Sequence, residues 1–453
     1  MPTPLLLVNA VGLTPRLLPL APRLSALARQ GWMRPVREVL PAVTTTAQAT
    51  ILTGQLPRTH GIVGNGWLFR DTGEVRFWQQ SNRLLQAEPL YATLKRRRPG
   101  FRCAKLFWWY NQGAEVAMSV TPKPYYGADG SKAFGITGTP EGFPAELERQ
   151  LGNFPFASFW GPLAGLPCTR WIAQAAALVL RQYRPDLTLV YLPHLDYDPQ
   201  RFGPSGCDMP RLLKELDDAC EPLLDAAQAI GANVWVVSEY GHLDVTEPRF
   251  PNRVLRQAGL LSVRDGPFGE TLDTFTSRAF AVCDHQVAHI YIRDEADRPV
   301  VRELLASLGQ VVAPAEVGLD HPRSGEWILL APPHAWYAYP YWLDERRAPD
   351  FARTVDIHRK PGYDPCELFF DPKFRFPKLH VARRLLARKL GFRNLLDVVP
   401  LDAQLVRGSH GIHAPDPLDR PLLIGHGPAP EAQTLEMSQI HELLLRALDE
   451  GGV

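Results

Sequence analysis

The chain alternates between short apolar runs and longer amphipathic runs, and this alternation constrains its fold more than any other feature. Residues 5–11, 187–192 and 234–237 are apolar runs of strand length. The stretches that precede the last two, residues 169–183 and 210–230, carry leucine, isoleucine and alanine at helical spacing. A strand that is apolar on both faces needs helices on both sides of its sheet. The pattern predicts a doubly wound, mostly parallel α/β sheet that binds ligands at the carboxyl ends of its strands.

The pattern of residues changes after residue 270. Two further strand-like runs, 288–292 and 326–330, flank a helical stretch at 300–308 and predict a small α/β insertion. Residues 337–376 are rich in aromatic residues, proline and aspartate, which is typical of a loop-rich cap. We therefore predict three parts: an α/β core (1–270), an insertion with a cap or lid (271–395) and a C-terminal return to the core (396–453).

Composition narrows the range of partners. The chain has 49 Lys and Arg against 48 Asp and Glu, so no basic surplus favours a nucleic acid polymer or an anionic membrane as its main partner. The N-terminus lacks the features of a signal peptide, and no apolar stretch is long enough to span a membrane. The six cysteines are widely spaced without a Cys-x-x-Cys pair, which favours reduced thiols. We expect a cytoplasmic protein with a small-molecule partner.

Residues 41–54 form a run of small and hydroxyl-bearing residues that leads into a short helix ending at Gly54. Thr44, Thr45 or Thr46 could serve as the N-cap of this helix. The N-terminus of a helix with a hydroxyl group beside it is also a ready site for phosphate. From these residues alone, a simple cap and a phosphate site both remain open.

Polar residues follow two of the predicted strands. His194, Asp196 and Asp198 come directly after the run 187–192, and at alternate positions they would share one face of an extended chain. Imidazole and carboxylate groups are ligands that divalent metals prefer, although a polar loop with aspartate caps explains the same residues. Glu239 and His242 follow the run 234–237, where a histidine can equally be an ordinary polar residue.

Taken in chain order, these motifs resemble the alkaline phosphatase superfamily, and within it the nucleotide pyrophosphatase/phosphodiesterase branch. Residues 41–54 are similar to that family's nucleophile segment, which closes on Leu-Thr-Gly and continues with Pro-x-x-His-Gly-Ile. The register of this resemblance places the nucleophile at Thr44. It adds Asn65 as a substrate-binding residue, and we expect Gln48, within the same helix, to help hold the phosphoryl oxygens.

The resemblance also implies a metal site. Asp196 and His410, the latter in Gly-Ser-His-Gly, match ligand positions of the family, and Glu239 stands where the family has aspartate. Three further ligand positions carry other residues: Val11, Gln200 and Tyr240. His242, two residues beyond Tyr240, is a candidate replacement ligand. We therefore expect one divalent ion rather than two, with zinc favoured and manganese or magnesium as alternatives.

Two other groups of residues are candidates for chemistry. His358 and Arg359 lie in the cap segment before a tight turn, where they suit an anionic group of a substrate, and His358 is a second candidate replacement ligand. Asp284 and His285 offer metal-binding chemistry, but we favour a structural role because they precede a predicted strand of the insertion.

The sequence thus predicts a metal-dependent phosphoester hydrolase that uses Thr44 as its nucleophile on a small phosphodiester or pyrophosphate. A binding protein that has lost hydrolysis is the alternative, and the changed positions Val11, Gln200 and Tyr240 favour it. A phosphotransferase or phosphomutase of the same superfamily differs only in the group that accepts the phosphoryl group, so the sequence does not separate it from a hydrolase.

Overall fold

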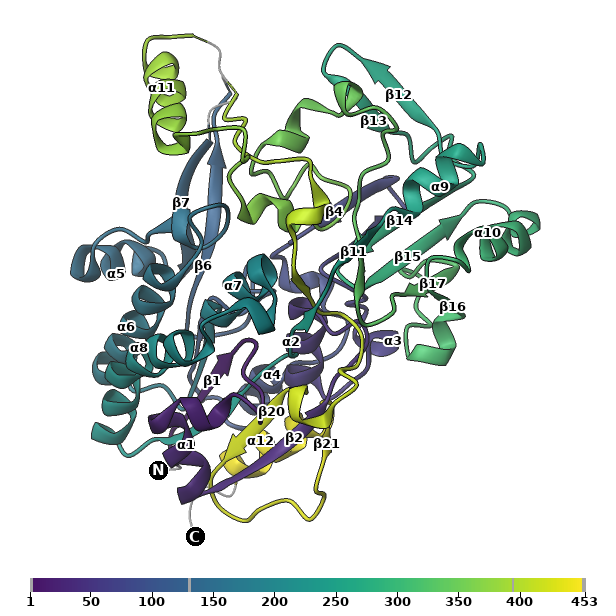
Figure 1. Cartoon of the computed structure of the whole chain (residues 1–453). Helices are drawn as coiled ribbons and strands as arrows, with labels where there is room; N and C mark the ends of the chain where they lie inside the picture. Colours follow the sequence, from purple (N-terminus) through teal and green to yellow (C-terminus); the bar gives the residue numbers. More distant parts are fainter. Residues whose placement is uncertain (1–2, 129–131, 393–394, 450–453) are drawn as a thin grey trace.

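The computed structural model describes residues 3–128, 132–392 and 395–449. Its centre is a nine-stranded sheet in which most neighbouring strands are parallel (Figure 1). The strand order is β21 (Leu435–Glu436), β2 (Trp32–Arg37), β20 (Leu422–Gly425), β9 (Asn233–Val237), β1 (Leu5–Ala10), β8 (Leu187–Leu192), β5 (Cys103–Leu106), β6 (Met118–Tyr126) and β7 (Lys132–Thr139). Strand β20 is antiparallel to both β9 and β2, and β6 and β7 form an antiparallel hairpin. The predicted doubly wound, mostly parallel sheet is confirmed.

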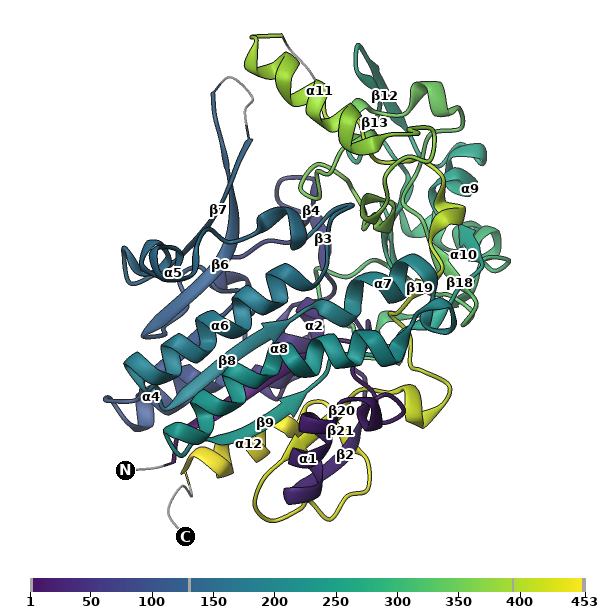
Figure 2. The same cartoon turned by 60° about the vertical axis from the view of Figure 1, so that its left-hand side comes forward.

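Helices cover both faces of this sheet because successive side chains of a strand point in opposite directions. Leu6, Val8 and Ala10 of β1 pack with one set of helices, while Leu5 and Leu7 pack with the other. Figure 2 shows α6 and α8 lying along the first face. The helices of the first face are α1 (Pro22–Gln30), α5 (Phe143–Leu151), α6 (Leu166–Tyr183) and α8 (Met209–Ala229), and those of the second are α2 (Thr44–Thr53), α4 (Leu90–Arg97) and α12 (Gln439–Asp449).

A second, four-stranded antiparallel sheet lies in the region where we predict an insertion. Its strands are β14 (Ala279–Asp284), β15 (Val287–Ile292), β17 (Trp327–Leu330) and β16 (Gln310–Val312), and its helices are α9 (Pro251–Gln257) and α10 (Arg298–Leu305). The two strands and the helix predicted for this region are confirmed. The chain then continues to α11 (Pro377–Lys389), which rises beyond the sheets on the same side of the molecule as the β6–β7 hairpin (Figures 1 and 2).

Short elements complete the fold. Four small two-stranded sheets pair β3 (Gly66–Phe69) with β4 (Glu74–Phe77), β10 (Leu243–Asp244) with β19 (Gly408–Ser409), β11 (Glu247–Arg249) with β18 (Ala335–Tyr337), and β12 (Val263–Gly266) with β13 (Gly269–Leu272). The remaining helices are α3 (Pro57–His60) and α7 (His194–Phe202). All six cysteines are unpaired. Within the described residues, no helix combines the length and the apolar character that crossing a membrane requires.

Two local predictions are wrong. The segment from His194 is not extended but forms helix α7, so Asp196 and Asp198 do not share a face, whereas Asp196 and Gln200, four residues apart, do. The N-cap of α2 is Val43 in an extended conformation, and its side chain has no capping group. None of the three threonines therefore caps this helix.

Candidate active site

The carboxyl ends of β1, β8 and β9 converge on the N-terminus of α2. The chain leaves β8 into α7, whose first turn carries Asp196, and leaves β9 into the segment that contains Tyr240 and His242. Thr44 is the first residue of α2. A cavity of about 790 Å³ opens here, and Thr44, Asp196 and Tyr240 are among the side chains that line it. The site therefore lies where ligands bind in open α/β sheets.

The three threonines of α2 have different partners. The Thr45 hydroxyl donates to the carbonyl of Gly64 at 2.7 Å, and the Thr46 hydroxyl donates to the carbonyl of Ile62 at 3.3 Å. These two bonds attach the start of α2 to the loop that follows α3. Only Thr44 of the three lines the cavity. The structure thus separates one threonine with access to a ligand from two that hold the backbone.

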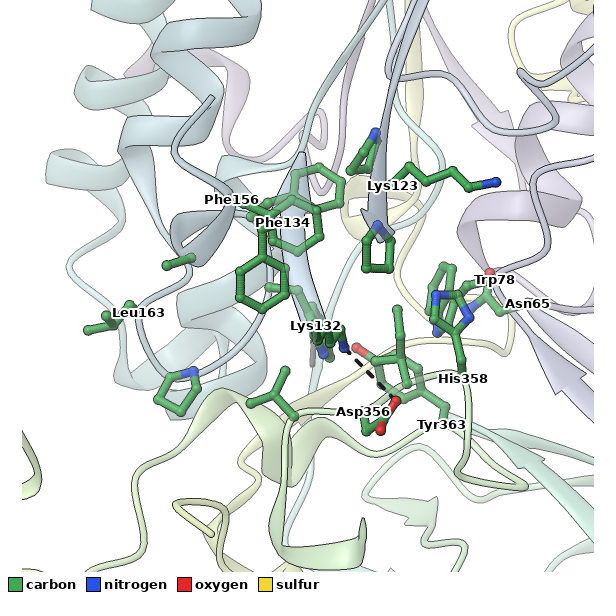
Figure 3. A pocket seen from close by; sticks show the side chains of 18 of the residues that line it. Asn65, Trp78, Lys123, Lys132, Phe134, Phe156, Leu163, Asp356, His358 and Tyr363 are labelled. Atoms are coloured by element: carbon green, nitrogen blue, oxygen red, sulfur yellow. Dashed lines mark ion pairs between the residues drawn. The ribbon is translucent and has the colours of Figure 1, made fainter. Parts of the chain in front are cut away.

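Asn65 lies beside Thr44 and is held firmly. Its backbone N–H and its side-chain amide both donate to the carboxyl group of Asp284, at 2.8 and 3.0 Å, and its side-chain oxygen accepts from the N–H of Thr45 at 3.2 Å. Burial raises the pKa of Asp284 to about 7. Asn65 lines the cavity (Figure 3), so this arrangement fixes an amide group next to the start of α2.

Asp196, which lines the cavity, forms a compact group with His242 and His410, neither of which is among the cavity-lining residues. Each offers one ligand atom, and these atoms lie within 4.8 Å of one another. His242 Nε2 is 3.1 Å from Asp196 Oδ1, and His410 Nε2 is 3.9 Å from the same oxygen. His410 Nδ1 donates to the carbonyl of Ala42 at 2.7 Å, which leaves the lone pair on Nε2, and this buried nitrogen has no hydrogen-bond partner among the described residues.

The electrostatics of this group suit a cation. Burial lowers the pKa of His410 well below its usual value, and His285 and His242 act in the same direction, so the imidazole is neutral. Burial alone would raise the pKa of Asp196, but the hydrogen bond with His242 and the proximity of His410 outweigh it and the net shift is downward. A carboxylate and two imidazoles are a donor set that fits one divalent ion.

Val11 and Glu239, which stand at two ligand positions of the family, do not fit a second ion. Val11 has no donor atom in its side chain. Glu239 Oε1 accepts hydrogen bonds from the side-chain amides of Asn9 at 2.5 Å and Gln48 at 2.7 Å, and burial raises the pKa of Glu239 to about 8. The carboxyl group is therefore neutral at pH 7. Amide donors and a neutral acid replace the charges that a second cation requires.

The hydroxyl group of Tyr240 lies between Thr44, the candidate nucleophile, and the carboxyl group of Asp196. Its hydroxyl lies 3.0 Å from Thr44 Oγ1 and donates to Asp196 Oδ1 at 3.2 Å. Its ring stacks on that of His410 with the ring centres 3.5 Å apart. Burial raises the pKa of Tyr240 well above its usual value, and the Asp196 and Glu239 carboxyl groups act in the same direction. The phenol is therefore neutral and can link Thr44 to Asp196 through its hydroxyl.

The remaining substrate-binding candidates lie in different environments. Gln48 is buried, and both ends of its amide are engaged, since Nε2 donates to Glu239 and Oε1 accepts from the backbone N–H of Trp109 at 2.7 Å. His358 and Arg359 both line the cavity. Burial lowers the pKa of His358, and the positive charge of Lys132 adds to this effect.

Two residues for which the sequence favours no catalytic role lie at the site: His285, for which a structural role is favoured over metal binding, and Tyr363. His285 sits in the turn between β14 and β15 with a positive φ of 59°, and its ring lies against those of Tyr363 and His410, at 3.8 and 3.7 Å between ring centres. The Tyr363 hydroxyl donates to Gln200 Oε1 at 2.8 Å, so the side chain at one of the three changed ligand positions is engaged by a phenol. The tight Asp-His-Gln turn between two apolar strands is the one sequence signal that pointed to His285.

Comparison with known proteins agrees with this geometry. Residues 5–364 match the family model of type I phosphodiesterase/nucleotide pyrophosphatase. No curated protein sequence matches significantly. Among solved structures, phosphonoacetate hydrolase from Sinorhizobium meliloti 1021 in complex with phosphonoformate is similar at 16% identity with a TM-score of 0.62, covering 100% of this chain and 96% of that chain.

Murine ectonucleotide pyrophosphatase/phosphodiesterase 5 is similar at 14% identity with a TM-score of 0.57, covering 98% of this chain and 95% of that chain. An inactive variant of the same murine protein in complex with AMP covers 99% of this chain. At these identities the solved structures establish a shared fold. The family model spans most of the chain, and the chain therefore belongs to the type I phosphodiesterase/nucleotide pyrophosphatase family, a family of phosphoester hydrolases.

Proposed function

We propose that this chain hydrolyses small phosphoesters, with Thr44 as the nucleophile and one divalent ion held by Asp196, His242 and His410. One observation carries the proposal: of the three threonines that open α2, Thr44 alone lines the cavity, and it does so beside Asn65 and the Asp196 group. Zinc is favoured over manganese or magnesium because two of the three donors are imidazoles.

Thr44 and Tyr240 supply the nucleophile and its orientation. A phenol carries a single proton, and Tyr240 donates it to Asp196. The Thr44 hydroxyl then donates to the phenol oxygen, which holds its proton away from the cavity and leaves a lone pair for attack on phosphorus.

Asn65 and the start of α2 bind the phosphoryl group. Asp284 fixes the Asn65 amide, so no ordering is needed when a substrate arrives. The N-terminus of α2 adds a favourable field for a phosphoryl anion. A divalent ion held by the Asp196 group would supply Lewis acidity toward a phosphoryl oxygen. Glu239, with a neutral carboxyl group, contributes to the architecture of the site rather than to metal binding.

The first experiment measures metal content and turnover together. Protein purified without chelators is analysed for bound metal and assayed with p-nitrophenyl phosphate and p-nitrophenyl thymidine monophosphate in zinc, manganese and magnesium. Thr44→Ala removes turnover but keeps the metal, Thr44→Ser retains part of the turnover, and Asp196→Ala loses both. Asp198→Asn is the matched control, because Asp198 lies on the same helix and pairs with Arg201 instead of the site. Full turnover in Thr44→Ala would refute the assignment of the nucleophile.

A binding protein without hydrolysis is the second candidate, and the position of Tyr240 favours it. Its hydroxyl lies 3.0 Å from Thr44 Oγ1. Val11 offers no donor atom at a position where the resemblance implies a metal ligand. This candidate predicts calorimetric binding of AMP or inorganic phosphate with no turnover of either ester in any metal. Transfer to an added alcohol such as methanol, measured in the same assay, would instead identify a phosphotransferase.

A further inference from the structure

Helix α11 carries apolar side chains on two sides. Val381 and Leu385, four residues apart, line the cavity of the candidate active site. Leu379, Leu386 and Leu390 recur at intervals of seven and four residues along another side, and they are 67%, 57% and 67% exposed. Leu390 continues the last turn of the helix, since its N–H donates to the carbonyl of Leu386 at 3.0 Å. The outer side of α11 is therefore an apolar stripe that the described part of the chain leaves open to solvent.

Cations border this stripe. Residues 372–396 contain eight Lys and Arg and no Asp or Glu, although the whole chain has 49 Lys and Arg against 48 Asp and Glu. His380 and Arg384 of this segment pair with Asp397. Five other cations are exposed and form no ion pair within the described residues: Lys373, Arg375, Lys378, Arg383 and Lys389. The near-zero balance of the whole chain thus hides a local positive surplus.

Two more exposed aromatic side chains lie at the same end of the molecule. Figures 1 and 2 both show α11, the end of the β6–β7 hairpin and the end of the β12–β13 hairpin at the top, away from the two termini. Tyr125, near the end of the first hairpin, is 51% exposed, and Phe268, in the turn of the second, is 62% exposed. Large exposed apolar side chains gathered at one end mark an interaction surface, and aromatic residues are favoured where a protein meets a membrane.

The combination of charge and apolar surface favours a lipid bilayer as the partner. A helix with leucines on one side and Lys and Arg beside them binds in the interface of an anionic membrane. A nucleic acid would neutralise the cations but leave the leucines in water. A second copy of the chain would bring two unpaired cationic faces together, and they would repel each other.

We propose that the outer side of α11 docks on an anionic lipid membrane. Leu379, Leu386 and Leu390 enter the boundary between the head groups and the acyl chains, and the cations beside them contact the anionic head groups. The proposal concerns where the protein binds, and it is independent of the proposed function. Because the other side of α11 lines the cavity, docking also fixes the orientation of the cavity relative to the membrane.

Co-sedimentation with vesicles tests the proposal. The full chain is mixed with vesicles of phosphatidylcholine alone and with vesicles in which phosphatidylglycerol replaces about a third of it. We expect binding to the anionic vesicles that weakens as salt is added, and little binding to the neutral ones. Equal binding to both kinds of vesicle overturns the proposal. Absence of binding to the anionic vesicles also overturns it and leaves an acidic protein surface as the partner of this face.

Two adjacent leucines provide a matched pair of variants. Leu386 lies on the outer side of α11, while Leu385 lines the cavity and is exposed to a similar extent, 52%. Leu386→Ser should weaken binding to the anionic vesicles about tenfold, because less apolar surface leaves water on docking. Leu385→Ser should bind as the wild type does. Circular dichroism checks that both variants keep the fold. Equal weakening in both variants would mean that the outer side is not the contact and would overturn the proposal.

A second pair of variants tests the charges. Arg383→Gln should lower the partition onto anionic vesicles about fivefold, since a cation near such a surface contributes about 1 kcal/mol. Arg29→Gln is the control, because Arg29 is exposed on α1, at the opposite end of the molecule (Figure 1). Equal effects of the two substitutions would overturn the proposal. Sedimentation without vesicles should give the same mass for the wild type and Leu386→Ser, and a dimer that Leu386→Ser dissociates would show that a second copy covers the stripe, which would also overturn it.

Discussion

The substitution Glu239→Gln tests whether the buried carboxyl group of Glu239 is protonated in the folded protein rather than ionised and bound to a metal. Its pKa is raised to about 8 by burial, against 4.5 when exposed. Because the folded pKa is the higher one, the folded state binds more protons than the unfolded state between pH 4.5 and 8. The free energy of unfolding therefore falls as pH rises through this window, by about 1.4 kcal/mol per pH unit from this group alone.

The size of the expected change in unfolding free energy follows from the folded and unfolded pKa values of Glu239. Between pH 4.5 and pH 7 the carboxyl group of Glu239 lowers the free energy of unfolding by about 3 kcal/mol, an upper figure for a fully buried group. Glutamine cannot ionise, and its side-chain oxygen can still accept from Asn9 and Gln48. Its amide nitrogen would take the place of Glu239 Oε2, a buried oxygen without a hydrogen-bond partner among the described residues. We expect Glu239→Gln to abolish this part of the pH dependence.

Urea unfolding followed by tryptophan fluorescence at pH 5, 6, 7 and 8 measures the effect. The difference in unfolding free energy between Glu239→Gln and the wild type should change by about 2.5 kcal/mol in favour of the variant from pH 5 to pH 7. Glu431→Gln, at an exposed position, is the control and should run parallel to the wild type. Bound metal should persist in Glu239→Gln. The reasoning is refuted if the unfolding free energy of both variants changes with pH as it does in the wild type and Glu239→Gln also loses its metal. Glu239 would then be an ionised ligand.

Three further predictions concern the site and its support. Asp284→Ala removes the hydrogen bonds that hold Asn65. In steady-state kinetics it should raise KM for p-nitrophenyl esters about tenfold, with a smaller effect on kcat. An unchanged KM would mean that Asn65 does not touch the substrate. His410→Ala should weaken zinc binding by more than about 100-fold in calorimetry, because even the loss of a residue that only orients a ligand costs about 10- to 100-fold. His426→Ala, at an exposed position, should leave the affinity unchanged, and equal affinity in both variants would exclude His410 as a ligand. Lys360→Met removes a buried cation that lies 2.7 Å from the carboxylates of both Asp364 and Glu367. Urea unfolding should show a free energy of unfolding lower by about 3–5 kcal/mol, because the two carboxylates lose their partner. A change below about 1 kcal/mol would contradict a buried ion pair.

Much of the fold follows from local patterns in the chain. The apolar runs at β1, β8 and β9 and the helical periodicity between them are enough to predict a parallel sheet with helices on both faces, because a strand apolar on both sides has no other stable environment. The end of α2 at Gly54 also follows from local chemistry, since Gly54 adopts a left-handed conformation that glycine favours. The motifs around Thr44, Asp196 and His410 were accessible because each occupies only a few adjacent residues.

The arrangement of the site depends on contacts that no local pattern contains. Helix α7 turns Asp196 toward His242, a residue 46 positions away, and Tyr363 engages Gln200 from a distance of 163 positions. His285 reaches the site through a strained turn of the second sheet. Periodicity along a chain reports whether a side chain is buried, but the direction in which a polar side chain points is decided by neighbours from distant segments. For this reason the residue types at the site could be read from the chain, whereas their partners, and the neutral state of Glu239, were decided by packing.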